Sequence, residues 1–230
     1  MNWFDKLSET FLTDDRYMWL VEGLGVTIVI TLGALAIGVA IGTLIAITKY
    51  FCEGNKKLRF LNWLCDLYTT VIRGIPVTVL LLVFFFVIFA SARDGTPVAI
   101  IAFGINSGAY VAENIRAGIL SVDIGQTEAG LSLGLPRSTT MMKIVIPQAI
   151  KNVIPAIGNE LIALIKETSI VSMIGMKDLN MAAQVIGGGN NLATYFAPML
   201  VAALFYLAIV YSLTFVIKKI EKRLRASDKR

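Results

Sequence analysis

Long apolar runs, separated by shorter polar segments, follow one another along the whole chain. A bilayer core of about 30 Å requires about 20 helical residues to cross it. Five runs reach that length, and they cover about 19–48, a stretch within 60–92, about 97–119, about 153–173 and about 195–217. The pattern therefore predicts an all-α membrane protein, one domain over residues 1–230, with about five transmembrane helices.

The composition agrees with this class. Hydrophobic residues make up 56% of the chain and charged residues only 16%, whereas a soluble domain carries about a quarter charged residues. There is no histidine, and the only cysteines are Cys52 and Cys65. Two thiols without histidine are too few ligands for a metal site. We expect no metal and no cofactor in this chain.

Basic residues predict the direction of the spans. Under a five-span topology, three segments share one side: the connection after the first run, the polar segment before the fourth run together with its edges at Arg116 and Lys151, and the tail over 218–230. They carry four, four and seven of the 21 Lys and Arg, fifteen in all, and the opposite side carries four. Because cytoplasmic segments are rich in Lys and Arg, we expect residues 1–16 outside and the tail inside.

A polar segment over 121–149 interrupts the apolar pattern on the predicted cytoplasmic side. Asp123 and Gln126 have the spacing of a capping box, which predicts the start of a short helix. Gly134 and Pro136 predict its end, because glycine releases the backbone and proline cannot continue a helix. The segment thus predicts a compact helix–turn–helix element outside the bilayer.

The second helix of this element is expected to start near Ser138 and to break at Pro147. Met141, Met142, Val145 and Ile146 would then share one face. The first helix carries small residues that would let another surface approach closely: Gly125, Ala129, Gly130 and Ser132. The same periodicity fits an amphipathic connector that lies on the membrane.

Polar residues inside the spans are candidates for a transport pathway, because such groups are costly in a bilayer unless they face protein or water. Asn106, Tyr110 and Glu113 share one face of the third span, and Glu160 and Glu167 share one face of the fourth. Counted at about 1.5 Å per residue, Glu113 lies level with Glu160, and Asn106 with Glu167.

The second span is too long for a single straight crossing. Gly74 and Pro76 predict a kink or break, and a break lets backbone groups line a cavity. Arg73, just before it, could bind a substrate carboxylate with two parallel hydrogen bonds. The alternatives are that Arg73 braces the bundle through Glu113 or Glu160, or that Arg116 and Glu113 reach out to the membrane interface. In the first span, Gly38 and Gly42 form a small-xxx-small pair that predicts close helix packing.

Six ordered blocks of sequence resemble the permease subunits of polar amino acid ABC importers. The EAA pattern of that family corresponds to Glu128-Ala129-Gly130 with Gly134, followed by Ile144-Val145-Ile146-Pro147; Gly130 and Ile146 depart from its usual Ala and Leu. The other blocks include Arg73-Gly74-Ile75-Pro76, Gly108–Glu113, Arg116–Ile119, Pro155–Glu160 and Lys166–Val171. Together the matches cover about 20–215.

The resemblance implies that the short helix after Asp123 couples the membrane domain to a cytoplasmic ATPase. The coupling residues would be Gln126, Thr127, Glu128, Ala129, Gly130, Ser132, Leu133 and Gly134. The chain has no GxxxxGK[ST] motif, so ATP and Mg²⁺ would be held by the partner, and this chain would not be an enzyme by itself.

The partners implied are two ATP-binding subunits, a second permease that is identical or homologous, and an external amino acid-binding protein. The chain would lie in the cytoplasmic (inner) membrane of a prokaryote, with no role for nucleic acid. Two other classes remain open on the residues alone. A stand-alone secondary transporter or channel would explain the broken span, and a membrane scaffold or receptor would explain the cytoplasmic element.

Overall fold

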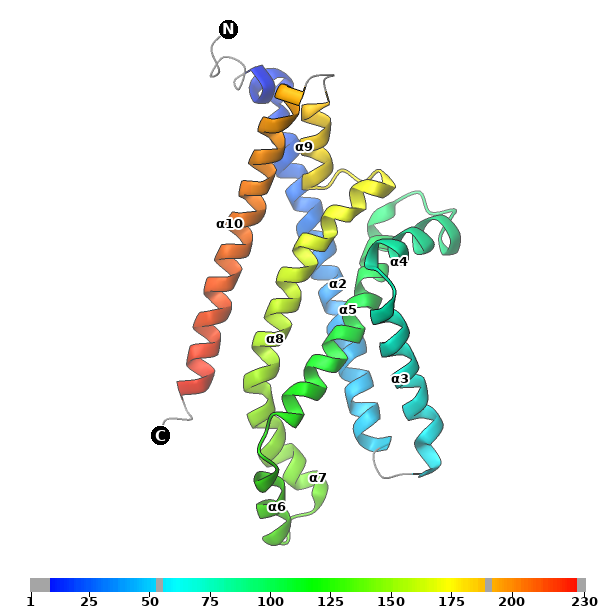
Figure 1. Cartoon of the computed structure of the whole chain (residues 1–230), viewed down its shortest axis with the longest axis vertical. Coiled ribbons are helices and arrows are strands. Elements are labelled where there is room, and N and C mark those ends of the chain that lie inside the picture. Colours follow the sequence, from blue (N-terminus) through cyan, green and yellow to red (C-terminus); the bar gives the residue numbers. More distant parts are fainter. Residues whose placement is uncertain (1–8, 53–55, 189–191, 227–230) are drawn as a thin grey trace.

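A computed structural model describes residues 9–52, 56–188 and 192–226 of the chain (Figure 1). All regular structure in these ranges is helical, as predicted. In order the elements are η1 (Thr13–Asp15), α2 (Arg16–Cys52), η2 (Lys56–Leu58), α3 (Arg59–Gly74), α4 (Val77–Val83), η3 (Phe84–Ile88), α5 (Gly95–Leu120), α6 (Ile124–Ser132), α7 (Arg137–Thr140), η4 (Met141–Val145), α8 (Ile146–Glu167), η5 (Thr168–Ile174), α9 (Leu179–Gly187) and α10 (Leu192–Arg225).

Three of the described helices are long and apolar enough to cross a membrane, namely Glu9–Cys52, Gly95–Leu120 and Tyr195–Arg225. A fourth candidate is the bent pair Lys56–Gly74 and Val77–Ile88, which turns by 102°. This bend confirms the break predicted at Gly74 and Pro76. The predicted ends of the chain, 1–16 and 218–230, lie partly outside the described residues.

The fourth predicted span differs from its expectation. α8 runs alongside α5 and α10 (Figure 1), and its 22 residues are enough to cross a bilayer, but it is less apolar than the three candidate helices and contains Lys151, Glu160, Lys166 and Glu167. It also ends at Glu167, and a 3₁₀ turn continues to Ile174. The count of five spans and their direction therefore stay predictions.

α2 and α5 pack closely against each other, as was predicted from Gly38 and Gly42. A Cβ added at Gly38 would lie 2.6 Å from Ser107 Oγ, and one at Gly42 would lie 2.6 Å from Val111 Cγ1. On α5, a Cβ at Gly104 would lie 2.7 Å from side-chain atoms of Ile37. Small residues on both helices thus let the two backbones approach closely.

The predicted break at Pro147 is wrong. α7, the π-helical turn η4 and α8 follow one another without a gap, and Pro147 stands in the first turn of α8. A proline ring clashes with the carbonyl four residues earlier, here that of Lys143. The wider π turn lies over that carbonyl, and such turns absorb an irregularity inside a helix.

α9 had no counterpart in the sequence expectations. Asp178 is its N-cap, and the carboxylate accepts hydrogen bonds from the backbone N–H groups of Asn180 and Met181. The Tyr206 hydroxyl of α10 lies 3.4 Å from the same carboxylate. Asp178 also touches α2, because a Cβ at Gly23 would lie 2.6 Å from its carbonyl oxygen. A buried acid thus joins α2, α9 and α10.

Candidate functional site

α6 lies at the end of the molecule opposite α9 (Figure 1). It begins where predicted, because the Asp123 carboxylate accepts a hydrogen bond of 2.7 Å from the Gly125 N–H. It ends in a Schellman motif: Gly134 has φ +78°, its N–H donates to Leu131 O, and the Leu135 N–H donates to Gly130 O. Start and stop both follow the sequence prediction.

Only one half of the predicted capping box forms. The Gln126 side chain does not reach back to the N-cap; its Oε1 accepts a hydrogen bond of 3.2 Å from Gln148 Nε2 of α8. Gln148 Nε2 also lies 2.9 Å from the Ile144 carbonyl oxygen. The competing partner lies 22 residues on, which is why local spacing could not reveal it. The contact ties α6 to the base of α8.

α6 presents an open surface of mixed character. Ile124 is 71% and Leu133 81% exposed. Most of the predicted coupling residues share this exposure: Gln126, Glu128, Ala129, Ser132, Leu133 and Gly134; Thr127 is half-buried. Exposed leucine and isoleucine beside an exposed carboxylate form a surface suited to docking.

Gly130 does not provide the open surface that was expected of the small residues in this helix. It is buried, and a Cβ there would lie 2.6 Å from Thr140 Cγ2 of α7. The close approach is therefore within the chain, between α6 and α7. The second predicted face is also imperfect, since Val145 is buried while Met142 is 63% exposed.

A charge network joins three helices below the bend of the second span. Glu113 of α5 accepts hydrogen bonds from Arg116 Nε and Nη2, at 3.0 and 2.8 Å. Arg73 Nη1 of α3 lies 3.9 Å from Glu113 Oε2, and Lys49 Nζ of α2 lies 4.0 Å from Glu113 Oε1. The Arg73 guanidinium carbon also lies 5.4 Å from the centre of the Tyr110 ring, within reach of a cation–π contact.

Lys49 is a member of this network that sequence reasoning used only for topology. Its Nζ lies 2.6 Å from Asp66 Oδ1 of α3. Lys49 and Asp66 lie in different helices at the same level, a relationship that periodicity within one helix does not reveal. The one signal in the sequence was the presence of a carboxylate, Asp66, inside the second apolar stretch, where it requires a partner.

The second group of predicted residues lies on α8. The Glu160 carboxyl lies beside Ser107 of α5. It also interacts electrostatically with the Glu167 carboxyl, which lies seven residues further along α8. Asn106, next to Ser107, is buried. The prediction that Glu160 and Glu113 lie at the same depth is therefore wrong. Glu160 faces Ser107, six residues or about 9 Å along α5 from Glu113, because the relative register of two helices depends on their tilt and crossing.

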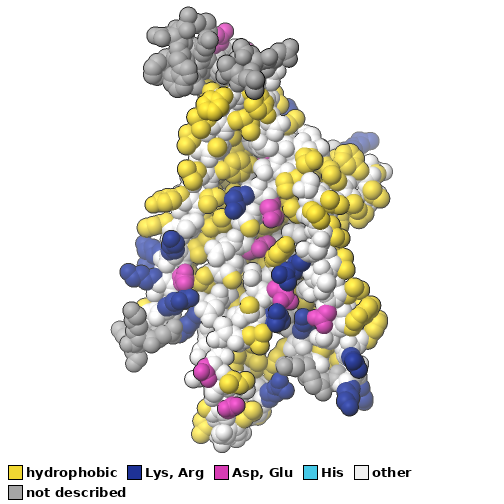
Figure 2. Space-filling view, viewed as in Figure 1, with side chains coloured by type: hydrophobic (Ala, Val, Ile, Leu, Met, Phe, Trp, Pro, Cys, Tyr) yellow, Lys and Arg dark blue, Asp and Glu magenta, His cyan; other side chains and the backbone are white. Residues whose placement is uncertain are grey.

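The predicted pathway residues thus fall into two neighbouring sets, Arg73, Tyr110 and Glu113 in one, Asn106, Glu160 and Glu167 in the other, with Gly74 and Pro76 at the bend. Figure 2 shows acidic and basic side chains along the middle of one face of the molecule, with hydrophobic side chains on either side. Charged groups within apolar helices usually face protein or water and not lipid.

The apolar helices, the broken span and the protruding α6 define a multi-pass membrane transport component. The chain belongs to the family described as binding-protein-dependent transport system inner membrane component, whose family model matches residues 38–226.

The similarity to individual relatives extends over nearly the full chain. The chain is 37% identical to the arginine transport system permease protein ArtQ of Bacillus subtilis, over 91% of this chain and 94% of that one. It is 40% identical to a putative glutamine transport system permease protein GlnP of Rickettsia bellii, over 92% and 95%. Among solved structures, an amino acid ABC transporter with histidines matches with a TM-score of 0.83 and 38% identity, over 93% and 98%.

Proposed function

We propose that this chain is the permease subunit of an ATP-driven importer that moves polar amino acids across the cytoplasmic membrane of a prokaryote. Its partners are two cytoplasmic ATPase subunits, a second permease and an external amino acid-binding protein. The family and the relatives named for arginine and glutamine transport support this class. ATP and Mg²⁺ belong to the ATPase subunits.

The observation that carries the proposal is the construction of α6. It stands at the end of the molecule, is fixed at both ends by Asp123 and by the Schellman motif at Gly134, and is tied to α8 through Gln126 and Gln148. A docking helix held this firmly transmits movement into α8 instead of bending. A mere surface connector between spans has no need of such fixation.

The transport path in this proposal follows a charged column that is formed by Arg73, Glu113, Glu160 and Glu167. Arg73, which is half exposed below the bend, binds the substrate carboxylate. The carboxylates of Glu160, beside Ser107, and Glu167 receive the ammonium group. Glu113 holds Arg73 in reach of the path, while Asn106 and Tyr110 line it. When ATP binding draws the ATPase subunits together, α6 moves and the spans expose the path to the outside.

A charge reversal on α6 tests the docking. Glu128 is exposed, so Glu128→Arg leaves the fold intact and places a repulsive charge at the interface. We expect the co-purifying ATPase to be lost together with ATP-dependent uptake. Glu221→Arg is the matched control, because it reverses a charge on the same predicted side but outside α6 and breaks only the Arg225 pair within α10. Retention of both partner and uptake in Glu128→Arg would contradict the proposal.

A further inference from the structure

We propose that the cleft between the predicted cytoplasmic ends of α2, α3 and α5 binds the phosphate of an anionic phospholipid headgroup. The cleft has a volume of about 680 Å³ and is lined by four cationic residues, Lys49, Lys56, Arg59 and Arg116. Its size falls within the range of small-molecule sites, roughly 300–1,000 Å³. It lies outside the coupling helix and at the end of the charged column.

The four cations are not fully neutralised by the protein. Lys49 pairs with Asp66, and Arg116 pairs with Glu113. Lys56 and Arg59 are exposed and have no ion pair with any described residue. Four positive charges against these two negative partners leave an excess of two, and the two unpaired cations both line the cleft. An anion is the complementary ligand.

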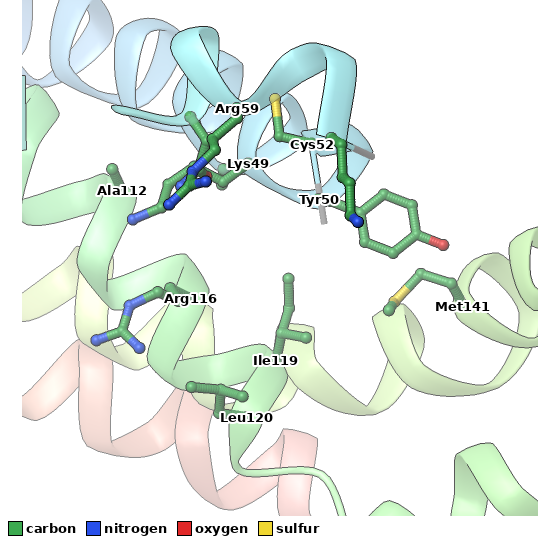
Figure 3. A pocket seen from close by; sticks show the side chains of 12 residues that line it. Lys49, Tyr50, Cys52, Arg59, Ala112, Arg116, Ile119, Leu120 and Met141 are labelled. Carbon is green, nitrogen blue, oxygen red and sulfur yellow. The ribbon is translucent and has the colours of Figure 1, made fainter. Parts of the chain in front are cut away.

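Cations line both walls of the cleft, and apolar side chains line one wall and one end. In Figure 3, Lys49 and Arg59 extend from the α2 and α3 side, while Arg116, Ile119 and Leu120 come from α5 on the opposite side. Met141 of η4 closes one end of the cleft. In the proposed site, a phosphate between the two walls meets cations from both sides, and the isoleucine, leucine and methionine side chains meet the start of the acyl chains.

Aromatic residues place the cleft at the level of lipid headgroups. Phe60 and Trp63, on the first turns of α3, are 69% and 53% exposed and stack with ring centres 5.8 Å apart. Phe51, at the end of α2, is 66% exposed. Exposed aromatic rings next to Lys and Arg are typical of the membrane–water interface, where anionic lipid is the abundant anion.

The position of Met141 gives the bound lipid a second consequence. Met141 follows α7 directly and precedes α8, so the cleft touches the same element that carries α6. A headgroup in the cleft holds the ends of α2 and α3 against η4.

The assembled transporter, with its ATPase subunits, is the sample for the test. Short-chain phosphatidylglycerol is titrated into it and counted by native mass spectrometry. A cation near anionic lipid is worth about a factor of five in affinity, so Lys56→Gln with Arg59→Gln should weaken binding about 25-fold. The matched control, Lys218→Gln with Lys219→Gln on α10, removes the same charge on the same predicted side and should change binding less than about two-fold. The charge-preserving pair Lys56→Arg with Arg59→Lys should bind normally.

Three results would overturn the proposal. Equal binding by the Lys56→Gln/Arg59→Gln variant and the wild type would show that the cleft is not the site. Displacement of the lipid by inorganic phosphate at equal concentration would make free phosphate the ligand. Absence of phosphatidylglycerol from the wild-type complex, with binding only after the ATPase is removed, would show that the partner protein covers the cleft.

Discussion

Arg73 of α3 and Glu113 of α5 lie 3.9 Å apart, measured from Nη1 to Oε2, directly below the 102° bend of the second span. The Arg73 side chain is 44% exposed, and Glu113 has a shorter partner in Arg116 at 2.8 Å. Arg73 is thus held close to Glu113, while Arg116 is the nearer partner of that carboxylate. An arginine held in this way remains available to a carboxylate from outside.

Replacing Arg73 distinguishes a substrate group from a structural brace. A long, half-exposed ion pair contributes at most about 1 kcal/mol to stability, so we expect Arg73→Ala to leave assembly with the ATPase intact. Uptake and amino acid-stimulated ATP hydrolysis should fall at least ten-fold. Arg73→Lys should restore only part of the activity, because lysine cannot form two parallel hydrogen bonds with a carboxylate.

The readout is uptake by proteoliposomes together with the amount of ATPase recovered with the permease. Glu221→Ala on α10 serves as the control, since it removes one exposed ion pair away from the path. Dissociation of the Arg73→Ala complex with unchanged uptake by the remaining assembled fraction would assign Arg73 to bracing.

Close packing of α2 on α5 makes Gly42 intolerant of a side chain. A Cβ at Gly42 would lie 2.6 Å from Val111 Cγ1 and 2.8 Å from the Ala112 backbone nitrogen. Overpacking of this kind costs about 1–3 kcal/mol, so Gly42→Ala should lower the melting temperature of the purified permease. Gly25 lies in the same helix with nothing within 4 Å of an added Cβ. Gly25→Ala should be neutral or slightly stabilising, and equal melting temperatures would refute the packing account.

Gly134 tests whether the stop of α6 matters for coupling. Its φ of +78° is left-handed, which costs a residue with a side chain about 1–2 kcal/mol. No atom lies within 4 Å of an added Cβ, so the cost is backbone strain alone. Gly134→Ala should reduce coupled ATP hydrolysis, whereas Gly134→Asn should retain most of it, because asparagine tolerates this conformation. Equal loss in both variants would point to a side-chain clash with the partner.

Asp94 gives a pH-dependent test of the start of α5. Its carboxylate accepts a hydrogen bond of 2.8 Å from the Thr96 N–H, and this bond, with a further one from the Thr96 side chain, holds the pKa of Asp94 below its ordinary value. A depressed pKa contributes stability above the unfolded pKa of about 3.9, and this contribution is lost as the pH falls through the folded value.

The wild type should therefore melt at a higher temperature than Asp94→Asn at pH 6, and the two should converge as the pH is lowered to about 3. Asparagine is the proper comparison because it keeps an N-cap acceptor and removes only the charge. A difference that persists unchanged at low pH would show that the charge of Asp94 contributes nothing to stability.

Local signals in the sequence were sufficient for the elements that local chemistry decides. Gly74 with Pro76, Asp123 at the start of α6, and Gly134 with Pro136 at its end all gave the structure that was predicted from them. Each is settled by the conformational needs of a few consecutive residues. The same holds for Gly38 and Gly42, where absence of a side chain fixes how close a neighbour can come.

Features that depend on two distant segments were not accessible in this way. The Gln126–Gln148 bond replaced a predicted local cap, a π turn accommodated Pro147, and Glu160 came to face Ser107 instead of standing level with Glu113. Asp178 joins three helices without any motif. Each outcome depends on helix tilt and register, which a single helix period leaves undetermined.

Uptake into proteoliposomes tests the central claim most directly. The permease is reconstituted with its ATPase facing the lumen, and labelled glutamine or arginine is supplied outside together with the binding protein. We predict uptake against a gradient when ATP is enclosed, none when ADP is enclosed, and loss of uptake in Glu128→Arg. Uptake driven by a proton gradient without ATP, and unaffected by Glu128→Arg, would contradict the account and identify a stand-alone secondary transporter.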